Sequence, residues 1–207
     1  MKHLTRVVLV LILFVAQSAW AGRGQERLDF FFQNVVTLKA DFSQLVTDEG
    51  GEVVQEASGT MKLLRPGRFR WDYDTPFKQT IVSDGQFLWV YDEELAQATV
   101  KEIGAALGAT PIMLLSEIRP VEEDFTIIEE TAEGDLDWVE LVPKMKDTDF
   151  RRIRFGLDSE GMKQMVLFDQ FGQKTVITFA DMKVNEEVAP SSFRFEVPPG
   201  VDLINAQ

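Results

Sequence analysis

The sequence contains no cysteine and only one histidine, His3, which lies close to the amino terminus. Without cysteine no disulfide can form, so an exported protein of this size relies on its hydrophobic core for stability. His3 falls in a segment that we expect to be removed, which leaves the mature chain without imidazole or thiol. Ser-His-Asp and Cys-His nucleophilic catalysis are therefore excluded, as are zinc sites built on nitrogen or sulfur. We predict no metal and no cofactor, and only carboxylates, lysines and hydroxyls remain for catalysis.

Basic residues are also scarce, because 21 Lys and Arg stand against 34 Asp and Glu, a formal net charge of −13 at pH 7. We expect such a chain to repel nucleic acid and anionic lipid headgroups, to stay monomeric, and to be drawn to basic partner surfaces. The acidic runs 122–124 and 129–130 could form a carboxylate dyad or a calcium site. Neither lies in a recognisable calcium loop, so solvated surface charge is the favoured interpretation.

The start of the chain has the organisation of a secretory signal peptide. A basic beginning precedes an unbroken apolar run over residues 7–15, and Ala19-Trp20-Ala21 supplies a small-x-small cleavage pattern. The run is shorter than the ~20 residues that a membrane-spanning helix needs, although an uncleaved membrane anchor is the alternative. The rest of the chain contains no repeat, low-complexity tract or Pro/Gly-rich linker. We therefore expect a cleaved signal peptide over 1–21 and a single domain over 22–207.

Most of the remaining chain alternates apolar and polar residues with a period of two, which is typical of half-buried strands. Strands are expected over 38–46, 53–64, 68–73, 79–83, 87–91, 97–102, 125–130, 136–143, 150–157, 162–169 and 174–184, with an extended edge piece over 193–201. Helical spacing predicts an amphipathic helix over 25–37, and Thr110-Pro111 begins a short apolar helix over 112–115. A twisted sheet of this size tends to curl. The predicted fold is mainly β, an incomplete (half-open) antiparallel β-barrel of about 11 strands with a helical lid over an apolar cavity.

Two of the expected strands are unusually aromatic. Along 68–73 one face carries Phe69, Trp71 and Tyr73, and the other face carries charged side chains. From the residues alone, ordinary core packing is favoured over ligand lining for this face. The strand over 87–91 is apolar on both faces, which predicts burial on both sides, but its sequence does not indicate which face lines the cavity.

Several groups of residues occur in an order and spacing that together resemble one known family. They are Ala40-Asp41-Phe42-Ser43-Gln44; Gly59 with Arg65-Pro66-Gly67-Arg68-Phe69-Arg70-Trp71; Val82-Ser83-Asp84-Gly85 leading into Leu88-Trp89-Val90-Tyr91; Gly108-Ala109-Thr110-Pro111; and Phe193-Arg194-Phe195 with Pro199-Gly200-Val201. The family is that of the periplasmic outer-membrane lipoprotein carrier, LolA. The resemblance extends over residues 38–203, and residues 144–172 match it only in pattern.

The resemblance implies a carrier in the periplasm, not an enzyme, which shields the acyl chains of lipoproteins in an apolar cavity. It implies that cargo arrives from an inner-membrane ABC transporter complex, LolCDE, and passes to an outer-membrane acceptor, LolB. It assigns Arg65 to holding the lid closed, whereas the alternative is a solvated charge in a turn. It also places Phe69 near the mouth of the cavity. The cavity lining is expected to comprise Phe42, Met61, Leu63, Phe69, Trp71, Trp89, Tyr91, Ile112, Met113 and Leu114.

Other interpretations of the same residues remain open. The helix over 112–115 is either a movable lid or a core helix. A lipid or peptide sensor could use the same fold as a regulatory module, and a second domain would distinguish it. A carboxylate-dependent hydrolase would need two acids that face each other in a polar cleft. The N-terminal helix could lie on a membrane surface, but the excess of acidic residues argues against this.

Overall fold

The computed structural model describes residues 22–103, 111–116, 120–130, 132–146 and 148–205, with the backbone alone at 111–113 and 129. The expected signal peptide lies outside these ranges. The elements are α2 (Arg23–Asn34), β1 (Thr37–Thr47), β2 (Val53–Leu64), β3 (Arg68–Thr75), β4 (Gln79–Asp84), β5 (Phe87–Asp92), β6 (Gln97–Glu102), α4 (Pro111–Ser116), η2 (Val121–Glu123), β7 (Phe125–Glu129), β8 (Asp137–Pro143), β9 (Phe150–Asp158), β10 (Gly161–Asp169), β11 (Lys174–Val184), η3 (Pro190–Phe193) and β12 (Asp202–Asn205). Among these elements, no helix is both long and apolar enough to cross a membrane.

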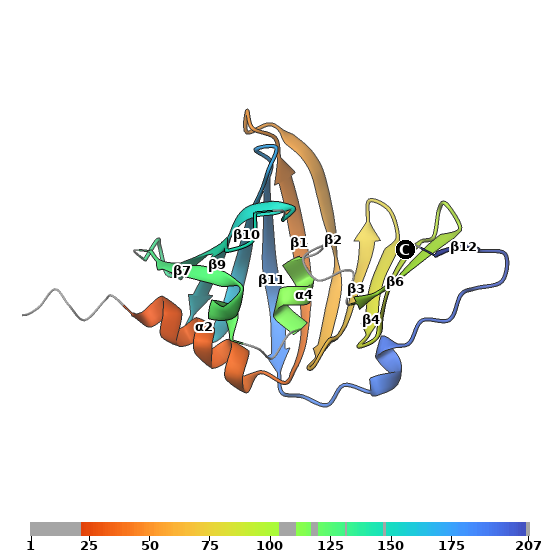
Figure 1. The fold of residues 1–207 in the computed structure, drawn as a ribbon, viewed down its shortest axis with the longest axis horizontal. Helices are drawn as coiled ribbons and strands as arrows, with labels where there is room; N and C mark the ends of the chain where they lie inside the picture. The colour runs from red at the N-terminus through yellow and green to blue at the C-terminus, as the bar shows by residue number, and fades with distance from the viewer. Residues whose placement is uncertain (1–21, 104–110, 117–119, 131, 147, 206–207) are drawn as a thin grey trace, which may run out of the picture.

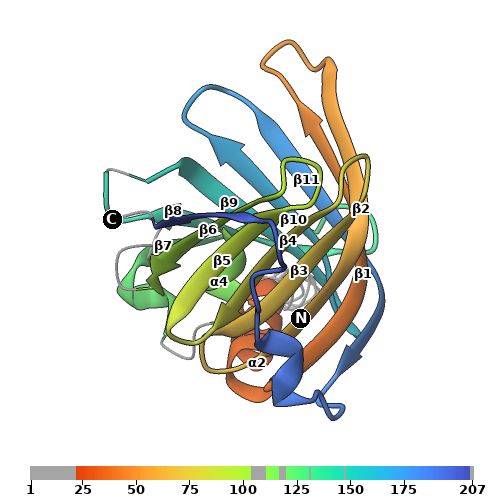
Figure 2. The ribbon, with the colours of Figure 1, turned by 90° about the vertical axis from the view of Figure 1, so that its right-hand side faces the viewer.

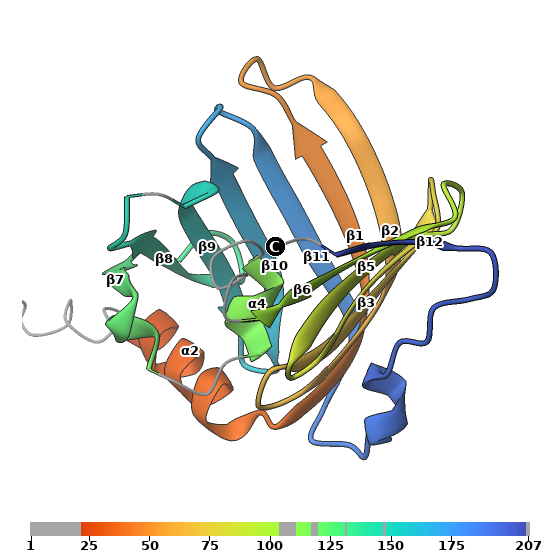
Figure 3. The same ribbon diagram turned by 45° about the vertical axis from the view of Figure 1, so that its right-hand side comes forward.

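All the described strands belong to one 12-stranded sheet in the order β12-β6-β5-β4-β3-β2-β1-β11-β10-β9-β8-β7. Neighbouring strands are antiparallel except β12, which pairs with β6 in parallel. The sheet curls strongly, and its two edge strands, β12 and β7, do not meet (Figures 1 and 3). This arrangement confirms the predicted half-open antiparallel barrel.

Of the described helices, α2 and α4 lie in the hollow of the curled sheet (Figure 3). The helix α2 packs against β7, β8, β9 and β10, and α4 packs against β2 and β3. Figure 3 shows α4 inside the curve of the sheet and α2 across one end. We call the side of the sheet that these helices cover the concave face, and the opposite side the convex face. The C-terminal tail instead crosses the convex face, where η3 contacts β3 and β4 (Figure 2).

The structure corrects the expected tail and the end of the first helix. The tail over 193–201 forms no strand, because the consecutive prolines Pro198 and Pro199 have no N–H to donate to a ladder. The extra strand begins only at Asp202. The first helix ends at Asn34 and not at residue 37, because Val35 is already extended and β-branched residues favour the strand that follows.

Gly59 shows why a glycine interrupts the long strand β2. The register between β2 and β3 shifts at Gly59, and a Cβ built there would lie 1.9 Å from the backbone oxygen of Asp72. The ring of Phe42 covers the same position from β1, with its nearest atom 3.0 Å from that Cβ. Only glycine allows this close approach, as expected for an isolated strand glycine.

Candidate functional site

Strand pairing brings five of the seven predicted lining residues that lie on strands onto the concave face. Met61 on β2 pairs with Trp71 on β3, and Leu63 pairs with Phe69. The rings of Phe42 and Trp71 lie 4.2 Å apart between centroids. These five side chains are at most 3% exposed and belong to one apolar cluster. The sequence alone favours ordinary core packing for two of them, Phe69 and Trp71, and in this structure all five side chains are packed beneath the helices.

Apolar residues of α2 and α4 cover this cluster. Phe31 and Phe32 of α2 are buried, and the ring of Phe32 meets that of Phe155 on β9 edge to face at 6.4 Å. From α4, Leu115 is 1% exposed and Leu114 packs at the edge of the cluster. The predicted lining residues Ile112 and Met113 belong to α4, but their side chains lie outside the described residues.

Arg65 connects both helices to the sheet. It is 5% exposed, so it is not the solvated turn charge that is usual beside Pro-Gly. Its Nε donates to the carbonyl of Leu115 in α4 at 2.9 Å. Its Nη1 donates to the carbonyls of Phe31, Phe32 and Val35 at 3.0, 2.7 and 2.8 Å. A single guanidinium therefore ties the ends of two helices to the β2–β3 turn.

The electrostatics of helix ends explains why a cation is stable here. The last carbonyls of a helix have no partner within the helix and carry partial negative charge, and α2 has no basic residue in its last turn. Arg65 supplies the missing cation from outside, and its guanidinium carbon lies 5.1 Å from the ring centroids of both Phe31 and Phe32. Burial lowers the pKa of Arg65 to about 10. The side chain therefore stays protonated near neutral pH.

The turn after Arg65 holds α4 through the backbone as well. The N–H of Gly67 donates to the carbonyl of Ser116 at 2.9 Å, and the Ser83 hydroxyl donates to the Gly67 carbonyl at 2.6 Å. Gly67 has a φ of +70°, a conformation that glycine adopts without strain. The Arg-Pro-Gly turn thus fixes the position of α4 at two points, one through the side chain of Arg65 and one through the main chain.

Trp89 and Tyr91 do not lie with the other predicted lining residues. Trp89 pairs with Val82 on β4, whereas Ile81 is the β4 partner of Trp71, so Trp89 and Trp71 are on opposite faces. Both Trp89 and Tyr91 pack against Phe195 of the tail with tilted rings, at 5.5 Å between ring centroids. This corrects the expectation for the two residues. The strand is apolar on both faces because the concave core covers one face and the tail covers the other.

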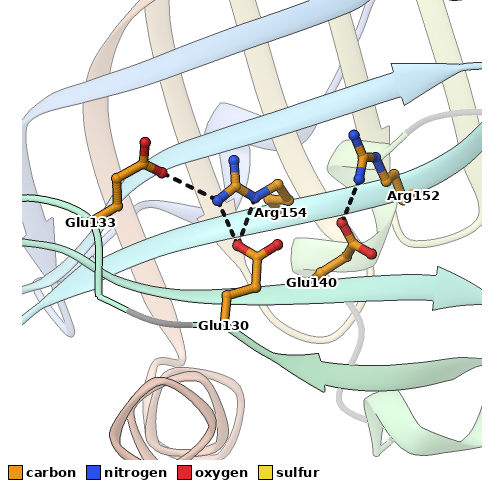
Figure 4. Close-up of polar contacts among 5 residues, drawn as sticks. All are labelled: Glu130, Glu133, Glu140, Arg152 and Arg154. Carbon is orange, nitrogen blue, oxygen red and sulfur yellow. Dashed lines mark hydrogen bonds and ion pairs between the residues drawn. The ribbon is translucent and has the colours of Figure 1, made fainter. Parts of the chain in front are cut away.

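Sequence reasoning also missed a charged network on the convex face of β8 and β9, which Figure 4 shows. Arg154 Nε donates to Glu130 at 2.7 Å, and Arg152 Nη1 donates to Glu140 at 3.0 Å. Burial lowers the pKa of Arg154, but its hydrogen bonds and charge pairs with Glu130 and Glu133 outweigh this and raise it. Glu130 is thus paired with arginine. This pairing disfavours the carboxylate-dyad interpretation of the run 129–130.

Comparison with known proteins gives a consistent result over nearly the whole chain. The family described as outer membrane lipoprotein carrier protein LolA matches residues 33–196. Proteins named outer-membrane lipoprotein carrier protein include one from Nitrosospira multiformis, 40% identical over 200 residues and covering 96% of each chain. Another, from Methylococcus capsulatus, is 41% identical over 197 residues and covers 95% of each chain.

Solved structures support the fold. A LolA superfamily protein from Nitrosomonas europaea superimposes with a TM-score of 0.50 at 12% identity, covering 82% of this chain and 95% of that one. An uncharacterised conserved protein from Thermus thermophilus superimposes with a TM-score of 0.57 at 12% identity, covering 88% of this chain and 98% of the other. At such identities the likeness concerns the fold alone.

Proposed function

We propose, from the premise that this chain belongs to the LolA family of outer membrane lipoprotein carrier proteins, that its concave face holds the acyl chains of its cargo. The chain is a lipoprotein carrier by family membership. The observation that supports the location of the site is the concave face itself. It is one continuous apolar cluster, and two helices linked through Arg65 cover it.

An apolar face of this kind meets the physical requirement on a lipoprotein carrier, which is to keep acyl chains out of water. Each methylene of an acyl chain costs ~0.8 kcal/mol to place in water, so a lipoprotein does not cross an aqueous compartment unshielded at a useful rate. Aromatic and aliphatic side chains offset that cost when they replace water around the chains. The apolar residues of α2 and α4 occupy the same face in this structure. The helices and the cargo therefore compete for one surface.

Competition between the helices and the cargo provides a route to release of the cargo. A lid that closes on the empty face lowers the apparent affinity for cargo by the free energy of closing. Arg65 contributes to that free energy, because it donates to α4 and α2 only when both helices lie on the sheet. In this proposal Arg65 stabilises the closed state, and the five buried residues Phe42, Met61, Leu63, Phe69 and Trp71 bind the chains when the lid opens.

The family and the pattern of residues 1–21 support a periplasmic setting for this transport. We place the protein in the periplasm, with residues 1–21 removed as a signal peptide and residues 22–207 forming one carrier domain. Acylated lipoproteins would reach it from an inner-membrane ABC transporter complex, LolCDE, and leave it for an outer-membrane acceptor, LolB. The excess of acidic residues favours basic docking surfaces on these partners. No catalytic step is proposed.

Substitutions on opposite faces of one strand test this assignment. Phe42 and Leu45 both lie on β1, but Phe42 is buried on the concave face and Leu45 is 36% exposed on the convex face. We expect Phe42→Ala to weaken binding of a dipalmitoylated cysteine peptide by about tenfold or more, because the smaller side chain buries less apolar surface against the acyl chains. Leu45→Ala should bind the peptide like the wild type. Equal affinities of the two variants, measured by fluorescence anisotropy, would exclude the concave face as the acyl site.

A further inference from the structure

The concave face is apolar, but it contains hydrogen-bond donors without acceptors. Trp71 is 3% exposed, and its indole Nε1 has no hydrogen-bond partner among the described residues. Nη2 of Arg65 is in the same situation. An indole N–H and a guanidinium N–H can only donate. A buried donor that finds no acceptor costs free energy, so native structures rarely contain one without a reason.

The neighbours of Trp71 do not supply an acceptor in this conformation. The hydroxyl of Tyr73, on the same face of β3, donates to Oε1 of Gln44 at 3.1 Å. Burial raises the pKa of Tyr73 and the nearby indole acts in the opposite direction, but the contact between indole and hydroxyl does not have hydrogen-bond geometry. The rings of Phe42 and Phe179 enclose the indole from β1 and β11, at 4.2 and 6.3 Å between centroids.

We infer that Trp71 Nε1 donates a hydrogen bond to an ester or amide carbonyl of the cargo lipid once α4 leaves the concave face. This inference rests on the proposed function and names the part of the cargo that the same site recognises. The hydrocarbon of an acyl chain is joined to an oxygen or nitrogen atom of the cargo through a carbonyl. Every acylated cargo therefore brings at least one hydrogen-bond acceptor beside its hydrocarbon. The site offers unmatched donors and the ligand offers acceptors.

The hydrogen bond makes the site prefer the loaded state and carbonyl-linked chains, a preference that hydrocarbon packing alone cannot provide. In the closed state the indole N–H is buried without a partner, and in the loaded state the carbonyl satisfies it. Trp71 therefore favours the loaded state over the closed one, in opposition to Arg65. It also discriminates acyl chains from alkyl chains of the same length, because an ether-linked chain has no carbonyl to accept the bond.

Two soluble lipids that differ only in their carbonyls test the inference. Displacement of a fluorescent apolar dye from the mature protein gives the dissociation constants of 1,2-dioctanoylglycerol, an ester, and 1,2-dioctylglycerol, the matching ether. We expect the wild type to bind the ester about five- to tenfold more tightly, the contribution of one hydrogen bond to a buried donor. In Trp71→Phe, which keeps an aromatic ring and loses the N–H, the ratio should fall to one or below. Trp89→Phe removes an indole N–H from the convex face and should keep the wild-type ratio.

A second measurement needs no change at position 71. In ¹H–¹⁵N spectra of the wild type, the indole signal of Trp71, identified by elimination with Trp89→Phe and Trp138→Phe, should move downfield with the ester and not with the ether. Equal dissociation constants for ester and ether in the wild type, or an unchanged indole signal, would overturn the role of Trp71 and leave the acyl site standing. Failure of both lipids to displace the dye would overturn the proposed function together with it.

Discussion

Replacement of Arg65 by leucine should open the lid. Leucine is apolar and fills part of the same space between Phe31 and Phe32, but it cannot donate to the carbonyls that Arg65 now contacts. The variant lacks the bond from Nε to the carbonyl of Leu115 in α4, at 2.9 Å, and the three bonds from Nη1 to the end of α2. The remaining bond from Gly67 to Ser116 still links α4 to the turn.

The size of the effect follows from two opposing contributions. A hydrogen bond from a charged donor contributes about 1.5–3 kcal/mol, and removal of the bond to Leu115 alone destabilises the closed state by that amount. Leucine also relieves the cost of burying the guanidinium, which is the cost that lowers its pKa. We therefore expect a net shift of about 1–2 kcal/mol, or about a five- to thirtyfold increase in the open population.

The absence of cysteine makes this population measurable. A single cysteine in place of Met61, which is 2% exposed on the concave face of β2, reacts with a maleimide only when α4 leaves the sheet. Its rate should rise about five- to thirtyfold in the Arg65→Leu background, in proportion to the open population. Arg68→Leu, a matched change at a convex position of β3, should leave the rate unchanged.

A cysteine far from the lid separates opening from general loosening. Val82 is fully buried on the convex face of β4, away from both helices. A cysteine in place of Val82 should react at the same rate in the wild-type background and in the Arg65→Leu background. If the Met61→Cys rate does not change in Arg65→Leu, or if both cysteines accelerate equally, the assignment of Arg65 as the residue that holds the lid is wrong.

Three further predictions concern Gly59 in the sheet, the protonation of Arg65, and Phe195 in the C-terminal tail. Gly59→Ala should lower the free energy of unfolding by about 2 kcal/mol or more in urea titrations, because its Cβ meets the backbone of Asp72 at 1.9 Å. In the folded protein the pKa of Arg65 is about 10, below its value in the unfolded chain. Arg65 is therefore protonated in both states between pH 6 and 8. The rate at which Met61→Cys reacts with the maleimide, corrected for the pH dependence of the reagent itself, should stay constant over that range. Phe195→Ala should lower the free energy of unfolding by about 1–3 kcal/mol and shift the fluorescence of Trp89 to the red, because it removes the ring that packs against that indole.

Matched controls make these outcomes decisive. Gly50→Ala, at an exposed turn where the new Cβ meets only the end of the Asp48 side chain, should change stability little, and an equal loss at Gly50 and Gly59 would contradict the packing argument. A titration midpoint between pH 6 and 8 would show that a group other than Arg65 governs the lid. Phe171 is 86% exposed, so Phe171→Ala should leave both stability and emission unchanged. Loss of stability there equal to that of Phe195→Ala would contradict a specific role for the tail.

Local alternation predicted the strands and the faces of β3 well, because a period of two directly reports which side of a sheet is buried. The same rule could not assign the faces of β5, since both are apolar and the tail that covers Trp89 lies about a hundred residues further along the chain. Nor could it predict β12, which follows two prolines and is exposed along its length. Strand pairing across long separations decides these features, and one sequence does not contain that information in its local pattern.

The burial of Arg65 illustrates a second limit of sequence reasoning. Beside Pro-Gly an arginine is usually solvated, and nothing in its immediate neighbours indicates that two helix ends converge on it. Only the resemblance to a known family linked Arg65 to the lid. The structure adds the physical reason, which is that the unpaired carbonyls of α2 and α4 meet at the guanidinium. The predicted amphipathic helix over 25–37 places Phe31 and Phe32 on its apolar side, and both rings lie beside this guanidinium.

Native mass spectrometry of the mature protein, purified from the periplasm after co-expression of a lipoprotein, addresses the carrier function itself. We predict a one-to-one complex of carrier and lipoprotein that disappears when the cargo is made without its acyl chains. A carrier that emerges without lipoprotein, or one that binds the non-acylated form equally well, would contradict the assignment of the concave face to acyl chains.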